Sequence, residues 1–188
     1  MEVITVQKRN PEMRAKKLRS SGFVPGVVFG GSLKESVSIQ MDEGTAQKLV
    51  RTKREGSKLK LDLDGKTLSV QVKEKEQNVL KNEIVHISFQ VLEEDQKVNS
   101  VIHIILKNAD MITGSIERML LEIPYASLPE DMIDTITVDL EGMKTGTAVT
   151  VADIPELQSD KIELQVDPES IIIRLSDKLR AAKQAAEE

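Results

Sequence analysis

The feature that most constrains the fold of this chain is a pair of alternating apolar runs on either side of an Asp-Gly dipeptide. Leucines alternate with polar residues over residues 59–63, and the same pattern resumes over residues 68–72 after Asp64-Gly65. Alternation with period 2 is typical of a half-buried strand. An Asp-Gly turn supplies the two positive φ angles that a type I′ hairpin needs. The sequence therefore predicts an antiparallel hairpin over residues 59–72.

Further alternation indicates a mainly β protein. Residues 35–41 and 85–91 alternate in the first half of the chain. Helices are expected over residues 42–54, with Asp42 or Thr45 as N-cap, and over residues 11–19, with Pro11 in the first turn. Short strands separated by turns predict a sandwich or barrel for each half. The second half is expected to hold strands at residues 100–107, 115–123, 135–139, 148–151 and 170–176, followed by a short terminal helix or a disordered tail at 177–187.

Charge divides the chain near residue 92. The net charge is −5, but residues 1–92 hold 17 Lys and Arg against 11 Asp and Glu, whereas residues 93–188 hold 9 against 20. The run Glu93-Glu94-Asp95 also ends the apolar alternation at this point. We therefore predict a basic domain of residues 1–92 and an acidic, all-β domain of residues 93–188. A polyanionic partner would be attracted to the first and repelled by the second.

Several function classes find no support in the sequence. The absence of cysteine excludes disulfides, thiol catalysis and cysteine-ligated zinc, and the only histidines are His86 and His103. No nucleophile elbow, Walker loop or dinucleotide fingerprint is present. We expect no enzymatic activity, no cofactor and no metal. The lack of a signal peptide or a long apolar run leads us to expect a cytoplasmic protein without a membrane partner.

A cluster of six cations against one acid lies between residues 8 and 19. Lysine and arginine side chains contact phosphate oxygens and release condensed counterions, so the cluster could hold RNA. A solvated surface segment explains the same composition equally well. The six cations are Lys8, Arg9, Arg14, Lys16, Lys17 and Arg19.

A glycine-rich apolar segment follows at residues 22–31. Gly22 and Pro25-Gly26 are expected to interrupt regular structure, and Gly30-Gly31 ends the apolar run 27–29. Glycines allow a backbone to approach a ligand closely, and Phe29 could stack on a base. The alternative is a buried strand with glycine turns, which is favoured for the valines of the run and evenly matched for Phe29.

The third candidate is the polar side of the strand near residues 84–92. His86, Ser88 and Gln90 point to one side of this strand because side chains alternate. Histidine can donate to a phosphate or a ribose hydroxyl. An ordinary half-exposed strand is the simpler interpretation of these three residues.

An ordered series of motifs resembles one family over nearly the whole chain. The family is the bacterial large-subunit ribosomal protein that binds 5S ribosomal RNA, in the long form also called general stress protein Ctc. The motifs are Lys16-Lys17-Leu18-Arg19, Gly22, residues 24–31, Asp64-Gly65-Lys66, residues 86–89, residues 127–132 and residues 138–146.

The resemblance implies a six-stranded N-terminal β-barrel with short helices and a second all-β domain. It also implies that the barrel grips 5S ribosomal RNA, and it places Arg9, Lys17, Arg19, Phe29, His86 and Ser88 at the family's binding positions. Phe29 stands where the family has tyrosine, Ser88 where it has aspartate, and Asn10-Pro11-Glu12 where it has Gly-Lys-Gly. Each lost contact could cost about 1–3 kcal/mol if its partner stays unpaired, so weakened or altered RNA binding is expected.

Together these observations predict a component of the large ribosomal subunit that binds 5S ribosomal RNA through its basic half. The cations would neutralise phosphates, Phe29 would pack on the RNA, His86 and Ser88 would form hydrogen bonds, and Gly30-Gly31 would permit close approach. The acidic half would face solvent or a neighbouring ribosomal protein. The alternative is a stress-associated protein that acts through protein partners with weakened RNA binding.

Overall fold

A computed structural model describes residues 3–81, 83–112 and 114–176. The chain forms two compact units. Unit 1 contains the residues up to Ser100 together with Leu128–Met132, and unit 2 contains Val101–Ser127 and the residues from Ile133 onward. The predicted terminal helix at 177–187 lies outside the described residues. The domain boundary between residues 92 and 93 stays a prediction.

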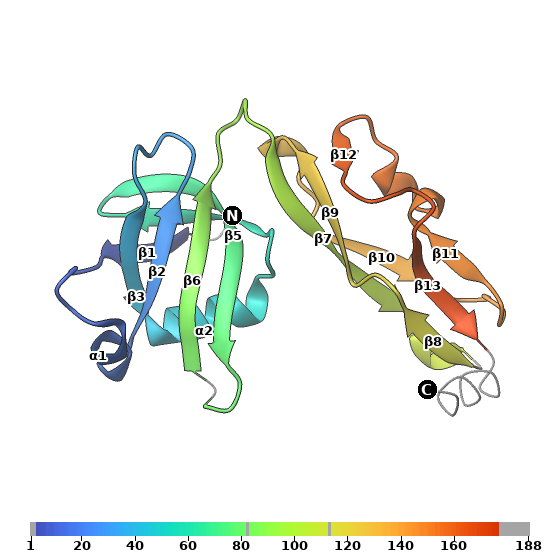
Figure 1. Ribbon diagram of the computed structural model, residues 1–188, viewed down its shortest axis with the longest axis horizontal. Helices are drawn as coiled ribbons and strands as arrows, with labels where there is room; N and C mark the ends of the chain where they lie inside the picture. The colour runs from blue at the N-terminus through green and yellow to red at the C-terminus, as the bar shows by residue number, and fades with distance from the viewer. Residues whose placement is uncertain (1–2, 82, 113, 177–188) are drawn as a thin grey trace. The chain divides into compact units, whose positions relative to one another are not determined.

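Unit 1 is a closed six-stranded barrel with the strand order β1-β3-β2-β6-β5-β4 (Figure 1). The mainly β fold and the N-terminal barrel implied by the family resemblance are thus confirmed. Four of the neighbouring pairs are antiparallel and two are parallel, β1 with β4 and β2 with β6. The strands are β1 (Val3–Lys8), β2 (Phe23–Phe29), β3 (Val37–Asp42), β4 (Lys58–Leu63), β5 (Lys66–Asn78) and β6 (Glu83–Val91).

The predicted hairpin is confirmed as β4 and β5. Asp64 and Gly65 have φ angles of 52° and 83°, the left-handed region that a two-residue type I′ turn requires at both positions. The carboxylate of Asp62 accepts a hydrogen bond from the amide of Gly65 at 3.0 Å. The turn is therefore fixed by three residues, Asp62, Asp64 and Gly65, whose chemistry is visible in the sequence.

Two helices accompany the barrel. Helix α2 (Glu43–Thr52) has Asp42 as its N-cap, with the carboxylate accepting from the amide of Thr45, and it buries Ala46 and Leu49 in the barrel core. Helix α1 (Ala15–Ser20) is shorter than the predicted 11–19. Pro11 lies in a turn instead, because the Asn10 side chain accepts the amide hydrogen of Glu12 and closes a local turn there.

The expectation that Pro25-Gly26 interrupts regular structure is wrong. Both residues are buried within β2, where Gly26 lies opposite Ile39 of β3 and Ile87 of β6. A β-carbon at Gly26 would lie 2.7 Å from the Ile87 carbonyl oxygen. The glycine is needed here for close strand packing. The alternative interpretation of the apolar run as buried strand holds for Val28, which has no exposed surface.

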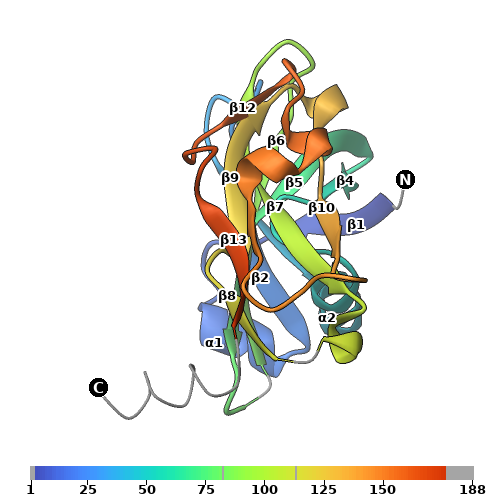
Figure 2. The same ribbon diagram turned by 90° about the vertical axis from the view of Figure 1, so that its right-hand side faces the viewer.

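Unit 2 contains two small sheets, with strand orders β10-β7-β9-β12 and β11-β13-β8. Figure 2 shows β9, β7 and β10 of the first sheet side by side. The predicted strand 115–123 is two strands, and β12 was not predicted. The strands are β7 (Val98–Lys107), β8 (Ser115–Arg118), β9 (Glu122–Ser127), β10 (Thr135–Asp139), β11 (Ala148–Thr150), β12 (Ile162–Leu164) and β13 (Ile171–Ser176).

Short 3-10 turns connect these strands. They are η1 (Ala109–Met111), η2 (Pro129–Asp131), η3 (Val151–Asp153) and η4 (Pro155–Leu157). None of the helices in the described part of the chain is long and apolar enough to span a membrane.

Tyr125 fixes a corner of unit 2. Its side chain is fully buried, and its hydroxyl donates to the Ile133 carbonyl at 3.0 Å and accepts from the Ile133 amide at 2.9 Å.

We expect Tyr125→Phe to destabilise unit 2 by about 1–3 kcal/mol, because both backbone groups lose their partner. Urea unfolding followed by far-UV circular dichroism measures the change. Ile172→Val, which removes one methylene from the same core, should cost only about 0.5–1.5 kcal/mol. Unchanged stability of Tyr125→Phe would contradict this role.

Candidate nucleic-acid interface

The candidate site residues predicted in segments 22–31 and 84–92 lie together on the outer face of β2, β6 and β5. Because β2 and β6 are parallel and in register, Val27 lies beside Ser88 and Phe29 beside Gln90. Neighbours on β5 continue these rows, with Gln71 opposite Gln90. The intervening residues of β6, including Ile87 and Phe89, are fully buried in the barrel core. The alternation of β6 therefore turns its polar residues outward, as predicted.

His86 and Ser88 lie next to each other on this face. The Ser88 hydroxyl is 3.4 Å from His86 Nδ1. Ser88 is only 8% exposed, whereas His86 is partly exposed. Of the two, the imidazole is therefore the group more accessible to a ligand, and the serine hydroxyl can orient the ring.

Phe29 is half-buried at the end of β2, with the glycine pair directly after it. Gly30 and Gly31 have φ angles of 80° and 56°, and a β-carbon at Gly31 would lie 2.8 Å from a methyl carbon of Val91. The two glycines are thus explained by the turn and by its packing against β6. Beside them, the Gln71 amide donates to Gln90 Oε1 at 2.9 Å. Phe29 therefore lies at one end of a polar strand face.

Arg19 is already paired within the protein. Its Nε donates to Glu83 Oε1 at 2.6 Å, its guanidinium is 3.5 Å from the Val85 carbonyl, and its side chain is 22% exposed. Helix α1 also packs against β2 (Figure 1). Arg19 thus fastens α1 to the start of β6, the strand that carries His86. Glu83 was not predicted, because a pair separated by 64 residues leaves no local pattern in the sequence.

Lys8 and Arg9 also have partners. Lys8 Nζ is 3.6 Å from Asp64 Oδ2, and both side chains are more than half exposed, so this ion pair contributes little stability. Arg9 donates to the Met13 carbonyl at 2.7 Å, while its Nε is buried without a hydrogen-bond partner among the described residues. Arg9 therefore holds the loop between β1 and α1 in place, and Lys8 can exchange its partner for a phosphate.

The remaining predicted cations are Arg14, Lys16 and Lys17. All three are exposed at the start of α1 or immediately before it, and no ion pair or hydrogen bond engages their side chains within the described structure. Lys17 also lies in the last turn, where a cation is favourable to the helix dipole. These cations are available to a polyanion, and α1 holds them beside the β2–β6 face.

The arrangement fits recognition of a ligand. Over residues 3–81, 83–112 and 114–176, no group of three or more histidine or acidic side chains is placed to hold a metal ion. What the face offers is a cationic helix, an accessible imidazole, the partly exposed amide of Gln90 and one aromatic ring.

Two family models match the chain one after the other, as the two β units follow each other in the sequence. Residues 4–89 match the Ribosomal L25p family, and residues 97–178 match the family described as ribosomal protein TL5, C-terminal domain.

Relatives match across most of their length. The large ribosomal subunit protein bL25 of Nitrosomonas europaea is 31% identical over 156 residues, covering 79% of this chain and 77% of the relative. That of Desulfitobacterium hafniense is 29% identical over 182 residues, covering 94% and 98%. The bL25 protein of Caldanaerobacter subterraneus is 25% identical and covers 100% and 96%. The chain belongs to the bL25 family, in its two-domain form, which confirms the resemblance found in the sequence.

Proposed function

We propose that this protein is a component of the large ribosomal subunit and binds 5S ribosomal RNA through residues 1–92. Membership of the bL25 family supports the ribosomal role, since the relatives are named as large-subunit proteins. The observation that carries RNA binding is the set of exposed, unpaired cations at Arg14, Lys16 and Lys17 beside the β2–β6 face. The protein recognises its partner without turnover and works in the cytoplasm, where ribosomes function.

The contacts divide into two kinds. Arg14, Lys16 and Lys17, together with Lys8, neutralise phosphates and set affinity. His86 donates a hydrogen bond to the RNA, and Phe29 packs against a base or sugar at the other end of the face. Arg9, Arg19, Ser88 and the Gly30-Gly31 turn position these groups through the contacts described above. This assignment moves Arg9 and Arg19 from the phosphate-binding set to a supporting role.

A titration of the full-length protein with 5S ribosomal RNA tests the proposal, with transfer RNA as the matched competitor and two salt concentrations. Three to five phosphate contacts predict a log–log salt slope of roughly −3 to −4.5. Preference for 5S ribosomal RNA should exceed tenfold. Equal affinity for both RNAs would overturn specific recognition. Failure to bind either RNA would favour a protein acting through protein partners.

The Arg19–Glu83 ion pair is expected to support RNA binding, because it fastens α1 and its cations to the start of β6. Glu83→Gln removes the charge of this pair and should weaken 5S ribosomal RNA binding by about two- to fivefold, the range expected for one partly exposed ion pair. Filter binding at fixed salt measures the effect. Glu43→Gln removes an equal charge from α2 and should leave the affinity within twofold. A stronger complex with Glu83→Gln would contradict the supporting role of the Arg19–Glu83 pair and would indicate that the released Arg19 binds phosphate.

A further inference from the structure

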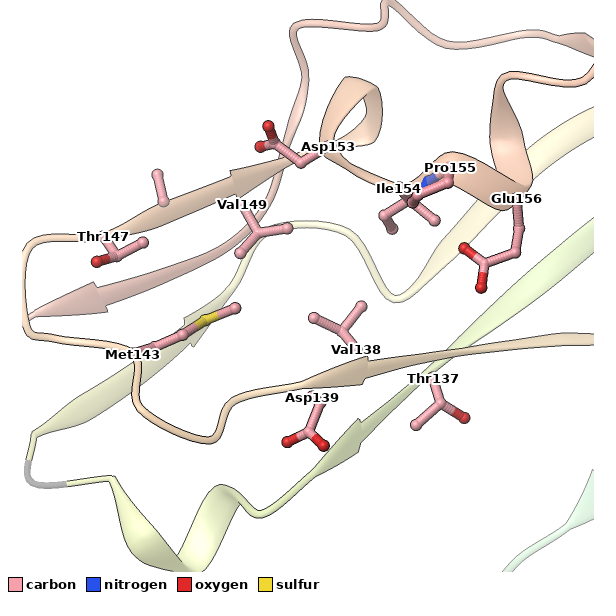
Figure 3. A pocket seen from close by; sticks show the side chains of 11 residues that line it. Thr137, Val138, Asp139, Met143, Thr147, Val149, Asp153, Ile154, Pro155 and Glu156 are labelled. Atoms are coloured by element: carbon pink, nitrogen blue, oxygen red, sulfur yellow. The ribbon is translucent and has the colours of Figure 1, made fainter.

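Unit 2 has two strand edges that border one groove and that pair with no other strand among the described residues. Strand β10 is the edge strand of its four-stranded sheet, and β11 is the edge strand of the three-stranded sheet. A groove of about 460 Å³ lies between them, lined by Thr137–Asp139 on one side and Ala148–Val149 on the other, with residues 153–156 at one end (Figure 3). A free strand edge is a template for pairing with another extended chain.

The backbone of β10 points a donor and an acceptor away from its sheet. The Asp134 carbonyl accepts from the His103 amide at 3.0 Å, and the Leu140 amide donates to the Lys107 carbonyl at 3.1 Å. Backbone groups alternate in direction along a strand, so the even-numbered residues of β10 face β7. The amide and carbonyl of Thr137 therefore face the open edge, where no described strand pairs with them.

The floor of the groove is apolar. Figure 3 shows Val138, Met143, Val149 and Ile154 pointing into the space between β10 and β11. Val138, Val149 and Ile154 belong to the core of unit 2 and are at most 7% exposed, whereas Met143 is partly exposed. An extended chain in this groove would place every second side chain against this floor, as strand addition requires.

The lining of the groove carries three carboxylates, Asp139, Asp153 and Glu156, and no cation. Hydrogen bonds from the Glu141 backbone and the Asn108 side chain lower the pKa of Asp139, and those from the Thr150 backbone and hydroxyl lower the pKa of Asp153. Both are therefore ionised at neutral pH.

The three carboxylates are not equally available. Lys107 lies 3.8 Å from Asp139 and offsets part of its charge, and Asp153 is held by Thr150. Glu156 has no partner within the described residues, and Figure 3 shows its carboxylate reaching from η4 toward β10. Glu156 is thus the charge best placed to meet an incoming chain.

We propose that this groove binds an extended basic segment of another protein, which pairs with the free edge of β10 and places lysine or arginine near Glu156. The net charge of residues 93–188, with 9 Lys and Arg against 20 Asp and Glu, selects a cationic partner over an anionic one such as RNA. This inference concerns unit 2 alone and does not depend on RNA binding by unit 1.

The test uses the full-length protein and a fluorescein-labelled peptide of alternating lysine and valine, seven residues long. An alternating glutamate–valine peptide is the charge control, and a lysine peptide with proline at every valine position is the backbone control. We expect the lysine–valine peptide to bind with micromolar affinity by fluorescence anisotropy and at least tenfold more tightly than either control. Amide chemical shift changes should centre on residues 137–139 and 148–156.

Two substitutions at Glu156 test whether the peptide binds in this groove. Glu156→Lys should weaken binding at least tenfold and Glu156→Gln about threefold, whereas Glu169→Gln, an exposed acid of unit 2 outside the groove, should leave it unchanged. Circular dichroism confirms that each variant is folded. Equal binding of the proline peptide, an unaltered affinity in both Glu156 variants, or chemical shift changes centred outside the groove would each overturn the proposal.

Discussion

Replacing Arg14, Lys16 and Lys17 together with glutamine is expected to weaken binding of 5S ribosomal RNA by about 100-fold at moderate salt. Each cation is exposed and free of protein partners in the described structure, so its whole charge is available to phosphate. A phosphate contact of this kind contributes on the order of 1 kcal/mol to binding. Losing three such contacts therefore costs about 3 kcal/mol, which corresponds to roughly a 100-fold loss of affinity. The log–log salt slope should fall by about 2–3 because fewer counterions are released. Stability should change little, since none of the three side chains holds the fold together.

A matched variant separates this interface from attraction to net charge. Arg51, Lys60 and Lys66 carry the same total charge. Lys60 lies on β4, which does not pair with β6, and Lys66 lies at the turn end of β5, outside the part of β5 that pairs with β6. The variant with all three replaced by glutamine should lose less than about fivefold in RNA affinity, because only the overall electrostatic field of the protein changes. If both triple variants lose affinity equally, the cations near α1 have no special place in the complex, although the protein would still bind RNA.

Local chemistry explains which parts of the fold could be predicted. The β4–β5 hairpin follows from Asp64-Gly65, and α2 follows from an apolar face and the Asp42 cap, because each signal spans only a few residues. The start of α1 was placed too early because Pro11 is common in first turns, whereas here the Asn10 side chain closes a separate turn. Strand β12 has only three residues, too few to show a period.

Long-range contacts explain what the sequence could not show about the site. The residue types were visible, and the alternation of β6 placed His86 and Ser88 on one side. What no local pattern contained was the competition for Arg19, which Glu83 holds from 64 residues away. The Met13 carbonyl that holds Arg9 is only four residues away, but a backbone acceptor is not marked by any residue type. Closure of the barrel through the parallel β1–β4 pair is equally non-local. The strand pattern left a sandwich or a barrel open, and the family resemblance implied the six-stranded barrel.

Gly26→Ala is expected to destabilise unit 1 by about 3 kcal/mol, the upper end of what overpacking a core usually costs. The added methyl group would lie 2.7 Å from the Ile87 carbonyl oxygen and 3.2 Å from Ile39 Cγ1. The side chain of Ile39 can shift, but the oxygen belongs to the backbone of β6, so relief requires the parallel β2–β6 pair to separate. That pair also carries the proposed RNA face, and the variant should therefore lose RNA affinity as well as stability.

The control for this effect is Gly44→Ala in the first turn of α2, where the nearest atom to an added β-carbon is a side-chain oxygen of Asp42 at 3.1 Å. Alanine is favoured over glycine in a helix by about 0.5–1 kcal/mol, which opposes the crowding, so the net change should stay below about 1 kcal/mol. Urea unfolding of both variants, monitored by circular dichroism, gives the comparison. If Gly26→Ala is as stable as the parent protein, β2 and β6 can move apart without loss. The glycine would then have to be explained by something other than the spacing of these two strands.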